Sequence, residues 1–166
     1  LFNKFSNFDK EYVATITLGL ATSTGDTQGK PIREDCCFDV KQEEVVKIFK
    51  DFIGQTKQIP PMVSALRFKG RRLYQLARRG IDVPRQPRDI RIDKLELRNF
   101  NLPWIEFYVK CSKGTYIRRL AEEIGERLNC GGCISQIRRI SLGPFTIKEA
   151  VTLNNLNENY IRLWQG

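Results

Sequence analysis

The sequence contains no histidine among its 166 residues, which removes several kinds of catalytic site. Serine–histidine and cysteine–histidine nucleophile pairs both need an imidazole as the general base. Glycine-rich phosphate loops of the Walker and Rossmann types are missing as well. The residues alone therefore show no catalytic set.

Long apolar runs are also missing, since none approaches the roughly 20 residues that a membrane span needs. No signal peptide is visible. The five cysteines are odd in number and irregularly spaced, unlike a secreted disulfide scaffold. Cys130 and Cys133 form a "CGGC" that leaves a zinc site or a redox pair open, but a second ligand pair is absent. Reduced thiols in a cytoplasmic protein are the simpler interpretation. The chain begins at Leu1 without a methionine, which indicates a fragment or a processed piece.

Acidic residues are few beside basic ones, 19 against 28, and the net charge is +9. Such an excess predicts a polyanionic partner, most often nucleic acid. Nine basic residues and two acidic ones fall between Leu66 and Arg91. Apolar and aromatic side chains such as Phe68 and Tyr74 lie among them, so bases can stack while arginines hold phosphates. A solvated charged face is the alternative, and the density of charge favours RNA or DNA contact.

The length of the chain predicts one domain, 1–166, and hydrophobic periodicity predicts an α+β fold. Alternation of apolar and polar residues predicts strands at 11–20, 90–100 and 105–112. A helical period predicts amphipathic helices at 42–54 and 115–128. Turn residues predict a turn at 23–31, and a strand and turn at 133–145. The proline-rich segment 59–91 contains a hairpin around Gly70 and a short helix stopped by Gly80, and it reads as an insertion.

The sequence pattern leaves the roles of several single residues open. Arg118 lies in the first turn of the 115–128 helix, where it can pair with Glu122 for about 0.3 kcal/mol or point into a cleft. In a cleft it needs an acid partner, and none is obvious in the sequence. Tyr12 fits a core tyrosine. Arg138 and Arg139 are either surface charges on a strand or a phosphate clamp.

Several long motifs resemble the bacterial TruB family of tRNA pseudouridine synthases. The main one is "CSKGTYIRRLAEEIGERLNCGGCISQIRRISLGPF", which starts at Cys111. "KEYVATITLG" resembles the tyrosine-bearing strand of the family, and "TSTGDTQGKP" resembles its following turn, although Ser23 stands where an aspartate is usual. "QIPPMVSALRFKGRRLYQLARRGIDVPR" is similar to the RNA-gripping insertion of the family, the thumb, here 59–91. The resemblance covers nearly the whole chain.

The resemblance implies a pseudouridine synthase-like catalytic domain with a mixed, mainly antiparallel sheet and packed helices. It implies base flipping of the T-loop uridine at position 55 of tRNA and isomerisation by an aspartate nucleophile, without metal or cofactor. Tyr12 matches the family tyrosine that stacks on the flipped uracil. Arg118 matches the arginine that pairs with the catalytic aspartate. Ile137 matches a position, usually leucine, that packs against the target base. The implied RNA-binding residues are Arg67, Lys69, Arg71, Arg72, Tyr74, Arg78, Arg79, Lys113, Arg138 and Arg139.

The nucleophile of the family lies in a "GTLD"-type motif, and none of the eight aspartates of this chain lies in one. The resemblance therefore implies a partial catalytic domain that is inactive until its nucleophile is supplied. It also implies that the C-terminal PUA domain, which many family members carry, lies outside residues 1–166. It implies a monomeric full-length protein in the cytoplasm, with the tRNA T-arm as partner and no membrane contact. The alternatives are a non-catalytic RNA-binding or RNA-chaperone module, and a basic domain that binds any polyanion.

Overall fold

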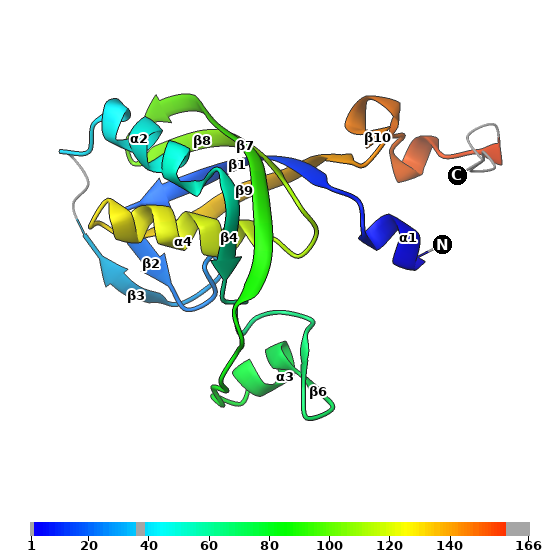
Figure 1. Ribbon diagram of the computed structural model, residues 1–166, viewed down its shortest axis with the longest axis horizontal. Coiled ribbons are helices and arrows are strands. Elements are labelled where there is room, and N and C mark those ends of the chain that lie inside the picture. The colour runs from blue at the N-terminus through cyan, green and yellow to red at the C-terminus, as the bar shows by residue number, and fades with distance from the viewer. Residues whose placement is uncertain (1, 36–38, 159–166) are drawn as a thin grey trace.

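The computed structural model describes residues 2–35 and 39–158, and a six-stranded sheet lies at its centre (Figure 1). The strand order is β10–β9–β1–β8–β7–β4, and neighbouring strands are antiparallel. The strands are β1 (Lys10–Leu18), β4 (Gly54–Gln58), β7 (Arg88–Asn101), β8 (Trp104–Cys111), β9 (Gly132–Leu142) and β10 (Phe145–Thr146). The central strands β1 and β8 therefore carry side chains toward both faces of the sheet.

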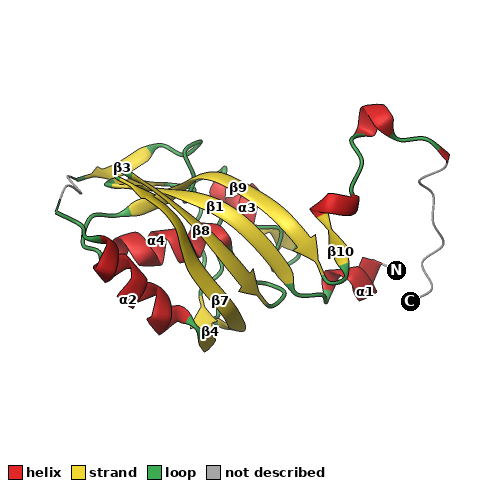
Figure 2. Cartoon of the chain, turned by 90° about the horizontal axis from the view of Figure 1, so that it is seen from above, coloured by secondary structure: helices red, strands yellow, loops and turns green. Residues whose placement is uncertain are grey.

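Two helices, α2 (Gln42–Phe52) and α4 (Ile117–Arg127), pack on the same face of this sheet, as Figure 2 shows from above. Alternation along β1 sends Ala14 and Ile16 toward these helices, where they are buried. The ring of Phe107 on β8 meets Phe49 of α2 edge-on, with 6.0 Å between ring centroids. Burial of these side chains fixes α4 against the strands, and with it the first turn that carries Arg118.

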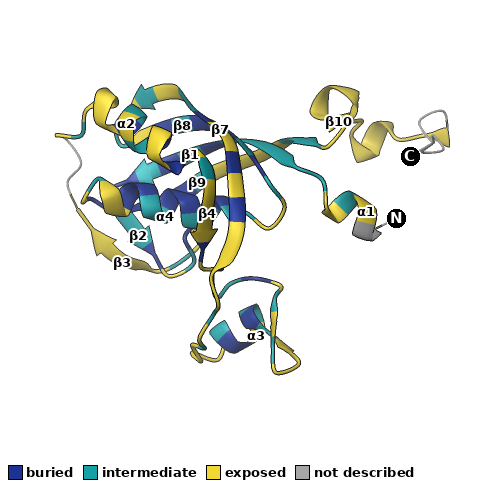
Figure 3. Cartoon of the chain, viewed as in Figure 1, coloured by how far each residue is buried: buried dark blue, intermediate teal, exposed yellow. Residues whose placement is uncertain are grey.

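The thumb leaves the sheet as a separate lobe between β4 and β7 (Figure 1). It contains the hairpin strands β5 (Arg67–Phe68) and β6 (Arg71–Arg72) and the helix α3 (Leu73–Ala77). Leu73 and Leu76 are buried inside the lobe, whereas much of its outer surface is exposed (Figure 3). The last four residues of the predicted insertion, 88–91, form the start of β7.

The remaining elements lie at the borders of the sheet. A small hairpin consists of β2 (Leu20–Thr22) and β3 (Pro31–Glu34), and the chain ends carry α1 (Phe2–Ser6) and the 3-10 turns η1 (Ile147–Glu149) and η2 (Leu153–Asn155). The rings of Phe5, Phe8 and Phe145 join α1 to β10, with centroids 5.5 to 6.5 Å apart. No helix in the described part of the chain is long and apolar enough to cross a membrane.

The predicted α+β class is confirmed, and the predicted strands and helices are found as β1, β7, β8, α2 and α4. The first strand was predicted too long, because Gly19 takes a φ of 79° and ends β1, so that Leu20 belongs to β2. Cys130 and Cys133 are buried, and neither forms a disulfide in the described part of the chain. Cys36 and Cys37 lie outside the described residues. Among the described residues, no three His, Cys, Asp or Glu side chains gather in a way that could hold a metal ion.

Candidate functional site

Arg118 projects from the first turn of α4 and donates hydrogen bonds to three acceptors on two other segments. Its Nη1 donates to Oδ2 of Asp26 at 2.9 Å and to the carbonyl of Thr24 at 3.3 Å. Its Nη2 donates to the carbonyl of Val63 at 2.8 Å. The side chains of Arg118 and Asp26 are each 27% exposed, so solvent screens their attraction less than at an open surface. Arg118 therefore ties both the loop after β2 and the start of the thumb to α4.

This arrangement corrects two expectations about Arg118. The sequence offered no obvious acid partner, yet Asp26 is that partner, from a position 92 residues away. Glu122 does not pair with Arg118: it pairs with Arg119 at 3.0 Å, and Glu123 does so at the same distance. Arg119 takes these carboxylates because it lies on the neighbouring side of the helix. The spacing of residues along a short segment cannot reveal a partner that lies so far away in the sequence.

The carboxylate of Asp26 has both oxygens engaged. Oδ1 accepts from the hydroxyl of Thr24 at 2.6 Å and from the backbone N–H of Gln28 at 3.2 Å, while Oδ2 accepts from Arg118. Burial by itself raises the pKa of Asp26, but the hydrogen bonds from Thr24, Arg118 and Gln28, with the charge of Arg118, outweigh burial and hold that pKa below its usual value. Asp26 is thus an ionised support for Arg118.

Replacement of this carboxylate by an amide is expected to destabilise the protein in a pH-dependent way. Because the pKa of Asp26 is lower in the folded state than in the unfolded chain, its contribution is fully present above about pH 4 and is lost as the pH falls through the folded value. Asp26→Asn should lower the free energy of unfolding by about 1–2 kcal/mol at pH 7, and by less at pH 3. Urea titrations at both pH values measure this, with Asp51→Asn as the control for removal of an exposed carboxylate. An equal loss at both pH values would contradict it.

The loop that carries Asp26 runs along the outer edge of β9. The backbone N–H of Thr27 donates to the carbonyl of Ile134 at 3.0 Å, and the N–H of Ile134 donates to the carbonyl of Gly25 at 3.0 Å. The hydroxyl of Thr22 closes the loop by donating to the carbonyl of Asp26 at 2.7 Å. The strand that carries Ile137 therefore also sets the position of Asp26.

Two bulges in β9 place Ile137 and Arg139 on the same face as Tyr12. Tyr12 pairs with Arg139 and Ala14 with Ile137, and residues opposite each other in a ladder share a face. The register shifts on either side of this stretch, once between Glu11 and Tyr12 and once between Thr15 and Ile16. Each bulge reverses the alternation of faces along β9. The stretch between the bulges therefore presents Ile137 and Arg139 toward the helix-covered face.

Tyr12 lies near the start of β1 and is half-buried. Burial raises the pKa of its hydroxyl, as does the nearby Cys111, whereas the charge and a hydrogen bond of Arg139 act in the opposite direction. Ile137 keeps 49% of its surface exposed, which is unusual for an isoleucine on a face that is otherwise packed. The structure thus brings Tyr12 and Arg139 together and leaves an apolar side chain, Ile137, accessible beside them.

The other two basic candidates outside the thumb lie elsewhere. Arg138 pairs with Val13, so its side chain lies on the face away from Tyr12. Lys113 follows β8 in the turn before α4, and its Nζ donates to the side chain of Asn7 at 2.7 Å. Arg138 and Arg139 therefore cannot clamp one phosphate together from the same side of β9.

The basic candidates of the thumb surround its small core. The guanidinium of Arg78 lies 5.5 Å from the ring centroid of Tyr74, and Lys69 lies 5.6 Å from that of Phe68, distances at which a cation is attracted to an aromatic face. Arg71, Arg78 and Arg79 line a surface hollow of 400 Å³ on α3. The site candidates Arg67, Lys69, Arg71, Arg78 and Arg79 are exposed, and Arg72 and Tyr74 are partly buried. This lobe presents positive charge and ring faces together.

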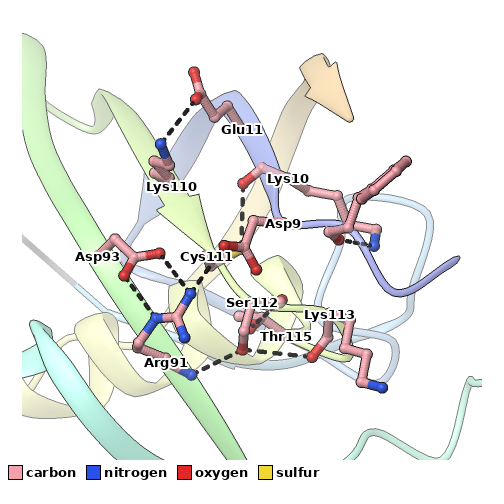
Figure 4. A network of polar contacts seen from close by, with 11 residues as sticks. Asp9, Lys10, Glu11, Arg91, Asp93, Lys110, Cys111, Ser112, Lys113 and Thr115 are labelled. Atoms are coloured by element: carbon pink, nitrogen blue, oxygen red, sulfur yellow. Dashed lines mark hydrogen bonds and ion pairs between the residues drawn. The ribbon is translucent and has the colours of Figure 1, made fainter. Parts of the chain in front are cut away.

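A polar network at the end of the sheet where β1 begins contains two further aspartates (Figure 4). Arg91 of β7 donates to Asp9 at 2.9 Å and to Asp93 at 2.7 Å, and its backbone N–H donates to the hydroxyl of Ser112 at 2.9 Å. The network joins the start of β1 to β7 and to the end of β8. Asp9 and Asp93 therefore serve structure here, whereas Asp26 contacts Arg118.

Comparisons with known proteins give matches along nearly the whole chain. The family model described as TruB family pseudouridylate synthase (N terminal domain) matches residues 1–117, and the one described as tRNA pseudouridylate synthase B C-terminal domain matches 118–165. Curated relatives named tRNA pseudouridine synthase B include one from Clostridium tetani, 45% identical over 94% of this chain and 54% of its own length, and one from Methylobacillus flagellatus, 44% identical over 93% and 52%.

Solved structures show the same fold. A chain of "Crystal Structure of a Cbf5-Nop10-Gar1 Complex" matches with a TM-score of 0.65 and 26% identity, over 91% of this chain and 36% of that one. A chain of "Structure of H/ACA RNP bound to a substrate RNA containing 2'-deoxyuridine" matches with a TM-score of 0.62 and 22% identity, over 93% and 35%. The present chain spans about half the length of the curated relatives that it matches.

Proposed function

The chain belongs to the TruB family of pseudouridylate synthases, and from this premise we propose that residues 1–166 form the RNA-binding and arginine-bearing part of a tRNA pseudouridine synthase. The proposed reaction converts the T-loop uridine at position 55 of tRNA to pseudouridine. The observation that carries the proposal is the placement of Arg118, which joins the thumb, α4 and the loop after β2. RNA gripped by the thumb would thereby lie next to an anchored guanidinium.

The chemistry begins with removal of the target base from its stack, which costs a few kcal/mol. Stacking on the ring of Tyr12 and packing against Ile137 offset that cost on the face where both lie. An aspartate attacks the nucleotide, the bond from C1′ to N1 breaks, and the base turns. A new bond then joins C1′ to C5 as the carboxylate is released, the proton of C5 is lost to solvent, and N1 takes up a proton. The proposed role of Arg118 is to hold the attacking carboxylate ionised and oriented.

Arg118 has the capacity for this role. A guanidinium has five N–H donors, and the three acceptors among the described residues, on Asp26, Thr24 and Val63, leave two of them for a further carboxylate. Asp26 itself is a poor nucleophile in this geometry, because hydrogen bonds hold both of its oxygens. We therefore assign Asp26 to support and propose that the nucleophile is an aspartate that residues 1–166 do not supply.

The proposed partner is the T-arm of tRNA. The exposed arginines of the thumb, with Lys113 and Arg139, would contact its phosphates, and Tyr74 would offer a ring face. Arg138 would contact RNA only if the strand also passes the face of the sheet away from Tyr12. Because tRNA is the partner, we place the protein in the cytoplasm, and we propose a monomer at full length; light scattering that gives a dimer mass would contradict the latter.

A non-catalytic RNA-binding or RNA-chaperone module is the second candidate, and one observation favours it. The charge of Arg118 is already balanced by Asp26 within the chain, so the fold needs no further acid to be stable. Such a module would bind T-arm RNA without turnover under every condition. A domain that binds any polyanion would instead show equal affinity for heparin, duplex DNA and T-arm RNA.

Tritium release from a T-arm stem-loop labelled at C5 of its uridine tests the proposed function. Residues 1–166 alone should release no tritium, because none of their aspartates lies in the nucleophile motif. Addition of a family segment with that motif, in cis, should produce stoichiometric release. Release by the chain alone would identify one of its own aspartates as the nucleophile. Absence of release after the addition, with T-arm binding intact, would favour the non-catalytic module.

A further inference from the structure

Gln58 makes a two-point contact that the mechanism above does not use. It is the last residue of β4, only 3% exposed, and directly precedes the thumb. Its side-chain Nε2 donates to the carbonyl of Tyr116 at 3.2 Å, and its Oε1 accepts from the backbone N–H of Tyr116 at 2.8 Å. A single buried amide therefore satisfies both backbone groups of one residue, as a strand neighbour would. Loss of this side chain would remove the acceptor of the Tyr116 N–H, whereas the Tyr116 carbonyl would keep its hydrogen bond from the N–H of Leu120 at 3.1 Å.

Tyr116 occupies a sensitive position, since it is the N-cap of α4, two residues before Arg118. Its own side chain forms no capping hydrogen bond. The Gln58 side chain thus restrains the backbone at the point where the helix begins. Because Arg118 lies in the first turn, a rotation of the cap residue would move its guanidinium relative to Asp26.

The base of the thumb, which follows Gln58 directly in the chain, also contacts the start of α4. The carbonyl of Val63, near the start of the thumb, accepts from Arg118 at 2.8 Å. The carbonyl of Pro60 accepts from Arg85 at 3.2 Å, which joins the outgoing and returning arms of the lobe. A cavity of 390 Å³ is lined in part by Val63 and Arg85 of the thumb and by Arg119 of α4. Gln58 and Val63 thus hydrogen-bond the start of α4 from the base of the thumb, beside this cavity.

We propose that Gln58 is a positioning residue that transmits the placement of the thumb to Arg118. When RNA draws the thumb toward the sheet, the segment from Ile59 to Val63 moves with it and pulls on Gln58, which stays paired in the ladder as the last residue of β4. The paired hydrogen bonds to Tyr116 convert that movement into a fixed orientation of the first turn of α4. Arg118 then receives its carboxylate only with RNA in place. This inference rests on the proposed function, because it takes the thumb to be the part that binds RNA.

Hydrogen–deuterium exchange on this chain, with and without a T-arm stem-loop, tests the transmission. In the parent protein, RNA should slow exchange both in the thumb and in the first turn of α4. Gln58→Met keeps the volume and removes both hydrogen bonds. Without RNA it should speed exchange at the start of α4 about tenfold, the effect of losing roughly 1.4 kcal/mol of local stability. With RNA it should retain slowing in the thumb and lose it in α4. Gln55→Met, an exposed glutamine on the same strand, is the matched control and should behave as the parent.

The outcomes separate this inference from the proposed function. Absence of RNA binding by the parent chain would overturn both the proposed function and the transmission, while exchange without RNA would still show whether Gln58 holds α4. Parental slowing in α4 of the RNA-bound Gln58→Met protein would overturn the transmission alone. If Gln58→Met does not fold, Gln58→Glu keeps an acceptor for the N–H of Tyr116, and slowing intermediate between the parent and a full loss is expected from it. Parental slowing in that variant would contradict the inference.

Discussion

Arg118→Lys is expected to lower the rate of tritium release by about 10²–10³-fold in the enzyme completed by its aspartate-bearing segment. That range is the usual cost of removing one preorganised donor from a reacting centre. A lysine keeps the charge, but its ammonium group cannot reach Asp26, Thr24 and Val63 in a fixed plane and still present donors to a further carboxylate. Single-turnover release at saturating T-arm RNA measures the chemical step without product release.

The neighbouring arginine offers a matched control. Arg119 lies one position along the same helix and faces Glu122 and Glu123. Arg119→Lys keeps a positive charge opposite both carboxylates, so its rate should stay within about threefold of the parent. A thermal melt of each variant shows that the protein is folded at the assay temperature. A rate for Arg118→Lys within twofold of the parent would refute the proposed role of the guanidinium.

Gly125→Ala is expected to destabilise the protein by about 3 kcal/mol, at the upper end of what overpacking usually costs. Gly125 lies in α4, where alanine normally stabilises a helix by up to ~1 kcal/mol. Here an added Cβ would lie 2.2 Å from the backbone carbon of Gly131 and 2.3 Å from the backbone nitrogen of Gly132, so helix and strand would have to separate. A fall in melting temperature of about 6–12 °C is expected for a chain of this size.

Lys47→Ala controls for the effect of alanine itself, because Lys47 is exposed on α2 of the same helical layer. It should change the melting temperature by less than 2 °C, about 0.5 kcal/mol for a surface site. Calorimetry of both variants makes the comparison. A Gly125→Ala protein as stable as the parent would mean that α4 can move away from β9 at little cost, and the anchoring of Arg118 described above would then be wrong.

The fold was largely predictable because its strands and helices bury one face each. Alternation along β1 and the helical period around Ile117 and Leu120 report that burial directly, and the structure confirms both. The break at Gly19 was missed because a glycine in a strand pattern does not reveal its φ angle. Element type therefore followed from the sequence, and the end of β1 did not.

The site was less predictable for two physical reasons. The pairing of Arg118 with Asp26 joins segments 92 residues apart, and no periodicity encodes such a contact. The faces of Arg138 and Arg139 depend on bulges that insert one residue each, at positions that carry no glycine or proline signal. Strict alternation from the buried Ile134 would place Arg138, not Arg139, beside Tyr12. The contact made by Gln58 was not predicted, because sequence alone does not show that a glutamine at the end of a strand is buried.

The geometry at the base of the thumb makes this lobe a separable module. Gln58 and Arg88 are paired directly across the ladder, so the chain leaves the sheet and returns to it at neighbouring points. A short turn between these two residues would close β4 and β7 into an ordinary hairpin, without any change in the order of the strands. Lobes of different length or charge could therefore be grafted at this junction, provided that each keeps the amide of Gln58 and a carbonyl at Val63. Under the proposed function, exchange of this one contiguous segment would direct the same sheet to RNA of another shape.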